Sequence, residues 1–142
     1  MLDLFGGSGA LGIEALSRGA LKAVFNDIDP ACRRIIAENL KHTGMPEKAI
    51  IFGKDALILP EILKKAGYIF NIIFLDPPYR KNLINNSLKV MVENGIIYDD
   101  GLVVAEHAAD EAVIVPPEAG LEIIKQKTYG DTMITLIVKR IN

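Results

Sequence analysis

The sequence predicts an α/β fold whose sheet is mostly parallel and ends in an antiparallel hairpin. Short apolar runs alternate with amphipathic segments along most of the chain, which is typical of β-α-β units. A glycine-rich turn follows the first apolar run, as expected at a strand-to-helix junction. Near the other end, two apolar runs flank Tyr129-Gly130-Asp131, which indicates a hairpin at the sheet edge.

Length and composition favour one domain, covering residues 1–142, with a single core. No apolar run reaches the roughly 18 residues of a membrane span, and no basic leader precedes the first strand-like segment. We therefore expect no membrane partner and a cytoplasmic location. The single cysteine, Cys32, excludes an internal disulfide. Because the net charge is −2, contact with nucleic acid must use local basic patches.

In the first half of the chain, turn and capping residues mark where each element begins and ends. Ser8 is a plausible N-cap for the first helix, and Gly19 lies just past its end. Asp29 precedes Pro30, the pattern of an N-cap followed by proline at the first helical position. The predicted strands are residues 1–5, 22–26 and 49–52, and the predicted helices are residues 10–18, 30–43 and 57–66.

In the second half, the apolar run at residues 68–74 predicts a fourth strand that ends at Asp76. A helix is predicted over residues 83–93. A turn at residues 99–101 leads into a fifth strand over residues 102–106. Residues 107–120 form a polar segment that contains Pro116-Pro117. The hairpin strands are expected at residues 121–128 and 132–139.

The glycine loop after the first strand has the spacing of a nucleotide-binding turn. Gly7, Gly9 and Gly12 satisfy G-x-G-x-x-G, and Asp27 lies 20 residues after Gly7. This pattern does not separate NAD from S-adenosylmethionine (SAM), because both place an adenosine ribose against an acid at the end of the second strand. Asp3 favours SAM, since a carboxylate there would attract an ammonium or sulfonium group and repel a pyrophosphate. The alternative is a glycine turn that binds nothing.

Three acids follow the second and third strands. Asp27 is the better ribose ligand, because its two oxygens can accept from both hydroxyls. Asp29 competes for that role, but its place before Pro30 makes it first an N-cap. Asp55 is placed to accept from the adenine amine, with Ala56 offering a backbone N–H, although Asp55 is nearly as well explained as a helix N-cap.

The tetrad Asp76-Pro77-Pro78-Tyr79 ends the fourth strand. Two consecutive prolines prevent the strand from continuing, because each lacks an N–H and has a fixed φ. An acid, a rigid turn and an aromatic ring thus stand at the carboxyl end of a central strand, where open α/β sheets bind ligands. The simpler interpretation is a strand-ending turn with a surface tyrosine.

Three segments, Leu2–Ala20, Ile73–Tyr79 and Tyr129–Thr132, together resemble the RsmD family of bacterial class I SAM-dependent methyltransferases, which act on guanine N2 of 16S ribosomal RNA. The resemblance covers nearly the whole chain. It implies a Rossmann-like sheet of seven strands with helices on both faces, and one antiparallel strand near the edge. It also implies SAM as methyl donor, no metal, and ribosomal RNA or the small-subunit particle as partner.

The resemblance further implies roles for individual residues. Asp76 and the carbonyl of Pro77 would accept the N–H bonds of the base amine, and Tyr79 would stack on the base. The residues implied for catalysis are Asp76, Pro77, Pro78 and Tyr79. Those implied for the cofactor are Asp3, Phe5, Gly6, Gly7, Ser8, Gly9, Asp27, Ile28, Asp55 and Ala56. Those implied for the substrate are Tyr79, Arg80 and Lys81, of which the basic pair is equally well explained as a solvated surface pair.

The sequence is also compatible with other functions and other target bases. Family members carry a basic N-terminal segment before the first strand, whereas this sequence begins at that strand, so a catalytically weak SAM- or RNA-binding module is an alternative. An NAD-dependent oxidoreductase is a further alternative, but it leaves Asp-Pro-Pro-Tyr unexplained. The tetrad chemistry alone also allows adenine N6 or cytosine N4. No His, Cys, Asp or Glu spacing suggests a metal site.

Overall fold

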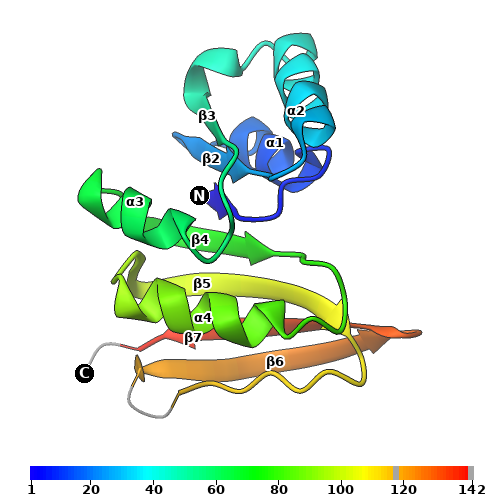
Figure 1. Cartoon of the computed structure of the whole chain (residues 1–142), viewed down its shortest axis with the longest axis vertical. Coiled ribbons are helices and arrows are strands. Elements are labelled where there is room, and N and C mark those ends of the chain that lie inside the picture. The colour runs from blue at the N-terminus through cyan, green and yellow to red at the C-terminus, as the bar shows by residue number, and fades with distance from the viewer. Residues whose placement is uncertain (117–118, 141–142) are drawn as a thin grey trace.

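The computed structural model describes residues 1–116 and 119–140, so Pro117 and the last two residues of the predicted domain lie outside it. Within these ranges the chain forms a seven-stranded sheet and four α-helices (Figure 1). The strands are β1 (Leu2–Asp3), β2 (Ala23–Asn26), β3 (Ala49–Phe52), β4 (Phe70–Leu75), β5 (Ile97–Ala108), β6 (Leu121–Tyr129) and β7 (Thr132–Lys139). The helices are α1 (Ala10–Ser17), α2 (Pro30–His42), α3 (Leu59–Lys65) and α4 (Leu83–Glu93), with a short 3₁₀ turn, η1 (Pro46–Lys48).

The strand order is β3-β2-β1-β4-β5-β7-β6. The five strands β1 to β5 are parallel to one another. β7 runs antiparallel to both of its neighbours, β5 and β6. This layout confirms the predicted fold class. Asp3 pairs with Phe25 on one side and Phe74 on the other, so the carboxyl ends of β1, β2 and β4 stand at one level. Residues that follow these strands therefore meet at one edge of the sheet.

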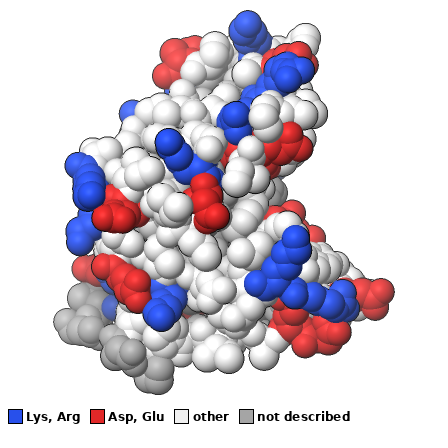
Figure 2. All heavy atoms as spheres, in the orientation of Figure 1, with Lys and Arg blue, Asp and Glu red and all other residues white. Residues whose placement is uncertain are grey.

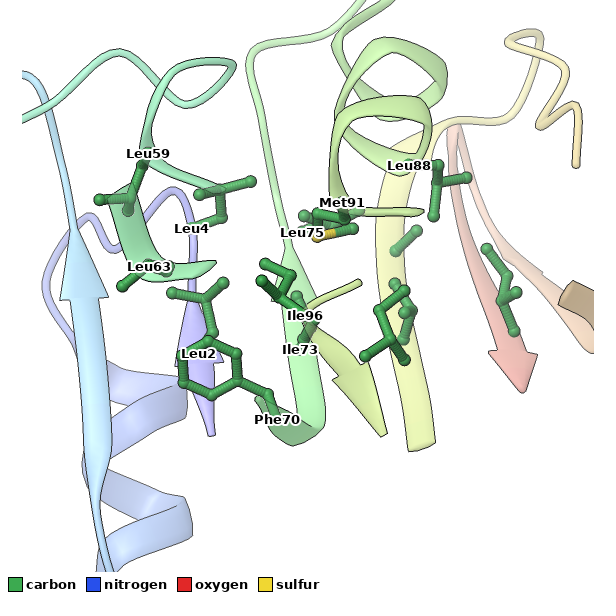
Figure 3. Close-up of a cluster of buried hydrophobic side chains, with 14 of the residues drawn as sticks. Leu2, Leu4, Leu59, Leu63, Phe70, Ile73, Leu75, Leu88, Met91 and Ile96 are labelled. Atoms are coloured by element: carbon green, nitrogen blue, oxygen red, sulfur yellow. The ribbon is translucent and has the colours of Figure 1, made fainter. Parts of the chain in front are cut away.

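The helices cover both faces of the sheet. The larger core lies between the sheet and the pair α3 and α4, where Leu63 and Met91 pack with strand residues such as Leu2 and Ile73 (Figure 3). Each such buried side chain contributes roughly 1.5–3 kcal/mol. A second core lies under α1 and α2 and includes Phe25, so the predicted single core is wrong, because the sheet has a packed helical layer on each face. No helix in the described ranges has both the length and the apolarity that crossing a membrane requires.

Five of the seven predicted strands have different bounds in the structure, and the difference is largest for the fifth. β5 begins at Ile97 rather than at residue 102, so the predicted turn at residues 99–101 lies inside the strand. Between the pairs Phe70–Ile97 and Ile72–Leu102, β5 advances five residues while β4 advances two. The extra residues form a bulge in which Asp100 has a φ of 62°. The first strand is shorter than predicted, because the chain already turns after Asp3.

The predicted N-cap of α1 was also wrong. Gly9, not Ser8, occupies the N-cap position with a φ of 81°, and no side chain caps the helix. The turn is closed instead by the backbone, since the Gly9 N–H donates to the Gly6 carbonyl at 2.8 Å. Glycine suits this position, because a residue with a Cβ would be strained in the left-handed conformation. At α2 the prediction is confirmed, as Asp29 accepts from the Ala31 N–H at 2.9 Å.

Candidate active site

A cavity of about 790 Å³ opens at the carboxyl edge of β1, β2, β3 and β4. Figure 2 shows a hollow in the right-hand outline of the molecule, with acidic side chains above and below it and basic side chains on its lower side. Of the predicted site residues, those that line the cavity are Asp3, Phe5, Gly6, Gly7, Ser8, Asp27, Ile28, Asp55, Ala56, Asp76, Pro77, Pro78 and Tyr79. Gly9, Arg80 and Lys81 are not among its lining residues. The fold thus brings the glycine loop and the tetrad to two sides of one cavity.

The glycine loop is held against the end of β2 by its own backbone. The Gly6 N–H donates to the Asn26 carbonyl at 2.7 Å, and the Gly7 N–H donates to Asp27 Oδ2 at 2.9 Å. Gly7 has a φ of 58°, a left-handed conformation that favours glycine. Gly12 has a different role, since a Cβ there would collide with the Phe25 ring. The last glycine of the pattern therefore permits close packing of α1 on β2.

Asp27 is oriented by two backbone donors. Its Oδ2 accepts from Gly7 and its Oδ1 accepts from the Asp29 N–H at 2.9 Å. The Arg33 guanidinium also donates to the carbonyls of Asp27 and Ile28, each at 3.0 Å, and so holds the backbone of this turn. Since the Asp29 side chain caps α2, Asp27 is the acid at this point that is presented to the cavity.

The end of β3 carries Asp55 and Ala56. Asp55 Oδ1 accepts from the Leu57 N–H at 2.8 Å, which forms an Asx turn ahead of α3. The N-cap position of α3 itself belongs to Ile58. The predicted N-cap role of Asp55 was therefore wrong, because its carboxylate closes an Asx turn ahead of the helix instead. Asp55 also lines the cavity, and its contact with adenine stays a prediction.

Asn26 is a site residue that sequence reasoning missed. Its side-chain amide donates to the carbonyls of Leu4 at 3.2 Å and Lys54 at 2.9 Å, and its Oδ1 accepts from the Lys54 N–H at 3.0 Å. This buried amide therefore ties together the carboxyl ends of β1, β2 and β3. The sequence feature that could have identified Asn26 is a polar residue at the end of an apolar strand, immediately before Asp27.

Asp3 is a buried carboxyl that forms no ion pair with any basic residue in the described part of the chain. Its exposed fraction is 1%, and its Oδ1 has no hydrogen-bond partner among the described residues. Burial, followed by the nearby charges of Asp76 and Asp27, raises the pKa of Asp3 to about 7. The pKa of Asp76 is also raised, first by burial and then by Glu106. These shifts mark a site with excess negative charge.

The charges that line the cavity are unbalanced. Five carboxyl groups line it, and Lys54 is the single basic residue among its lining residues. The five are Asp3, Asp27, Asp55, Asp76 and Glu106. Such a lining favours a ligand that carries positive charge and disfavours a pyrophosphate.

The tetrad leaves β4 directly after Leu75, and all four of its residues line the cavity. The Tyr79 side chain is half-exposed, and its hydroxyl lies 2.9 Å from Thr132 Oγ1. Arg80 is bound by the segment after β5, since its N–H donates to Glu111 at 2.6 Å and its guanidinium lies 3.1 Å from Asp110. Lys81 is exposed.

Glu106 and His107 at the end of β5 point to opposite faces of the sheet. Glu106 lines the cavity, whereas the buried His107 ring bonds with Thr135 Oγ1 at 2.8 Å and with the Ala108 carbonyl at 2.9 Å. His107 is therefore structural, and Glu106 belongs to the site. Among the described residues, no group of three or more His, Cys, Asp or Glu residues is arranged to hold a metal ion.

Comparison with known proteins identifies the family. The model of the family described as "Conserved hypothetical protein 95" matches residues 1–138. The chain belongs to this family. The Ribosomal RNA small subunit methyltransferase D of Escherichia coli (strain K12) is 32% identical over 135 residues, and the alignment covers 95% of this chain and 66% of that protein. The resemblance to the RsmD family is thereby confirmed.

Two further relatives agree with this assignment. The YlbH protein of Bacillus subtilis (strain 168) is 38% identical over 140 residues, which cover 98% of this chain and 75% of that protein. The solved structure of the yhhF protein of Escherichia coli superposes with a TM-score of 0.87 at 28% identity, covering 99% of this chain and 77% of that one. The RsmD-family chain described here thus spans about two thirds to three quarters of the length of these relatives.

Proposed function

We propose that this RsmD-family chain transfers a methyl group from SAM to an exocyclic amine of a nucleobase, most specifically guanine N2 of small-subunit ribosomal RNA. The observation that carries the proposal is the placement of the glycine loop and the Asp76–Tyr79 tetrad on two sides of one acidic cavity. Family membership supports the same chemistry, as does the E. coli relative named for methylation of small-subunit ribosomal RNA. The partner would be that RNA or the small-subunit particle, in the cytoplasm.

The residues on the cofactor side fit SAM. The unpartnered Oδ1 of buried Asp3 is an acceptor for an ammonium group, and Asp27 is an oriented acceptor for ribose hydroxyls. Asp55 and Ala56 would hold the adenine through the carboxylate and a backbone N–H. SAM, when bound, supplies the methyl group attached to a positively charged sulfur.

The residues on the acceptor side would activate the amine. Its lone pair is delocalised into the base ring, so it is a weak nucleophile. Asp76 and the Pro77 carbonyl would accept its two N–H bonds, which directs the lone pair to the methyl group and stabilises positive charge on nitrogen. Tyr79 would stack on the base and fix its plane for in-line attack, and stacking contributes about 1–3 kcal/mol. The raised pKa of Asp76 favours its taking up the proton that leaves the amine.

The test is methyl transfer from labelled SAM to small-subunit RNA and to small-subunit particles, with the product digested to nucleosides. We expect N2-methylguanosine from the wild-type protein. Asp76→Ala should abolish transfer and leave SAM affinity nearly unchanged, whereas Asp99→Ala, which removes an equal charge from an exposed position on β5, should be active. Full activity of Asp76→Ala would contradict the proposal.

The other functions considered predict different results. A SAM- or RNA-binding module of low activity would bind SAM and RNA but transfer no methyl group. An NAD-dependent oxidoreductase would bind NAD, which calorimetry with NAD and with SAM distinguishes. The unbalanced acidic lining disfavours NAD, because its pyrophosphate would lie among carboxylates.

A further inference from the structure

We propose that the hydroxyl of Thr132 positions Tyr79, and that the hairpin turn between β6 and β7 is therefore part of the acceptor site. This inference rests on the proposed function, in which Tyr79 holds the target base. It gives a role to Tyr129-Gly130-Asp131-Thr132, which the mechanism above does not use.

The contact joins two segments that are 53 residues apart in the sequence. Tyr79 Oη lies 2.9 Å from Thr132 Oγ1, and this is the one side-chain hydrogen bond of Tyr79 among the described residues. The side chain of Tyr79 also lines the cavity and keeps 36% of its surface exposed. With the hydroxyl occupied by the hairpin, the ring face is what Tyr79 offers to a base.

Thr132 is a firm anchor because its backbone is fixed on both sides. It pairs with Ala108 of β5 and with Tyr129 of β6. The adjacent Asp131 carbonyl accepts from the Ala109 N–H at 2.8 Å, which ties the turn to the segment that leaves β5. The hydroxyl that meets Tyr79 thus projects from a three-stranded part of the sheet.

The loop that carries Tyr79 needs such an anchor. Arg80 has a φ of 60° and Asn82 a φ of 52°, both left-handed conformations that are uncommon for residues other than glycine. The bonds from Arg80 to Glu111 and Asp110 hold the loop behind Tyr79. They do not orient the ring of Tyr79, and the bond to Thr132 does.

Orientation of the ring matters for methyl transfer. A base stacked on Tyr79 takes its plane from the ring, so rotation of the ring moves the amine away from the line of attack. Small errors in the position of a reacting atom reduce the rate strongly. Thr132 would therefore act through Tyr79, as a positioning residue that does not itself contact the reacting atoms.

The experiment compares four variants by kcat and KM for RNA and by SAM affinity. Thr132→Val removes the hydroxyl at nearly constant volume and shape, and Tyr79→Phe removes the other half of the bond while keeping the ring. We expect each to lower kcat/KM for RNA about threefold to tenfold, with SAM affinity unchanged. The double variant should lose no more than either single one, because both remove the same bond. Thr132→Ser should retain nearly full activity.

The matched control is Thr128→Val, which removes a hydroxyl from the same hairpin and should leave the kinetics unchanged. Normal kinetics of Thr132→Val would overturn the inference about Thr132 and leave the proposed function standing. Losses of activity that multiply in the double variant would do the same.

Amide hydrogen exchange of residues 79–82, measured without RNA, gives a readout that needs no activity. Exchange should be faster in Thr132→Val and Tyr79→Phe and normal in Thr132→Ser, and equal exchange in all would overturn the inference. Absence of methyl transfer by the wild-type protein would instead contradict the proposed function.

Discussion

The backbone N–H of Gly7 donates a hydrogen bond of 2.9 Å to the carboxylate of Asp27. The bond joins the glycine loop to the end of β2. Because the other oxygen of Asp27 accepts from the Asp29 N–H, the orientation of the carboxylate is set by the backbone. A ribose hydroxyl would thus meet an acceptor that is already in place, which lowers the entropic cost of binding.

Asp27→Asn should weaken SAM binding about tenfold or more, because an amide places an N–H group against one of the two backbone donors. Isothermal titration calorimetry with SAM checks this. Asp29→Asn is the matched control, since asparagine is as good an N-cap as aspartate and α2 should keep its start. Equal losses of affinity in the two variants would contradict the ribose role of Asp27.

Asp3 should make the protein less stable as the pH rises from about 4 to about 7. The pKa of Asp3 is about 7 in the folded protein and 3.8 in the unfolded chain, so the folded state holds the extra proton in this window. Its contribution is fully present below pH 3.8 and is lost as the pH rises through 7, a difference of roughly 4 kcal/mol. Asp3→Asn should remove this part of the pH dependence.

Urea unfolding of both proteins at several pH values between 4 and 8 measures this effect. Other carboxyl groups also titrate in this range, so the quantity to compare is the difference in unfolding free energy between wild type and Asp3→Asn. The variant should be the more stable protein at pH 8 and should bind SAM more weakly. A difference that does not change with pH would show that Asp3 is ionised in the folded state.

Much of the fold could be predicted because it follows from local patterns. The bounds of β3 and α4 agree with the predicted ranges, since Pro46 and Gly53 flank the short apolar run of β3 and Asn94-Gly95 ends α4. The meeting of Asp27 and Asp76 in one cavity also followed from parallel strands that share a carboxyl edge.

The features that could not be predicted depend on partners distant in the sequence. β5 continues through Asp99-Asp100-Gly101 because β4 offers it a parallel partner on both sides of the bulge. The contact between Tyr79 and Thr132 depends on where β7 is inserted in the sheet. Local residue preferences contain no information on either pairing.

Asn26→Ala should destabilise the protein by about 2–4 kcal/mol. It removes three hydrogen bonds and leaves the carbonyls of Leu4 and Lys54, and the Lys54 N–H, without this partner near the core. Asn26→Asp keeps the acceptor for the Lys54 N–H but loses both donors and adds an acid close to Asp27. Thermal and urea unfolding should rank wild type above both variants. A loss below about 0.5 kcal/mol would show that water replaces the amide.

Arg80 and Lys81 should contribute to RNA affinity without affecting SAM. The ion pair of Arg80 with Asp110 is exposed, and such pairs contribute about 0–1 kcal/mol, so an RNA phosphate can displace it. Arg80→Ala and Lys81→Ala should each weaken RNA binding and reduce the slope of log affinity against log salt by about one. Asp110→Asn should strengthen RNA binding, because it removes the competing carboxylate. Lys89→Ala on α4 is the control of equal charge, and an equal salt effect in that variant would indicate a nonspecific contribution of net charge.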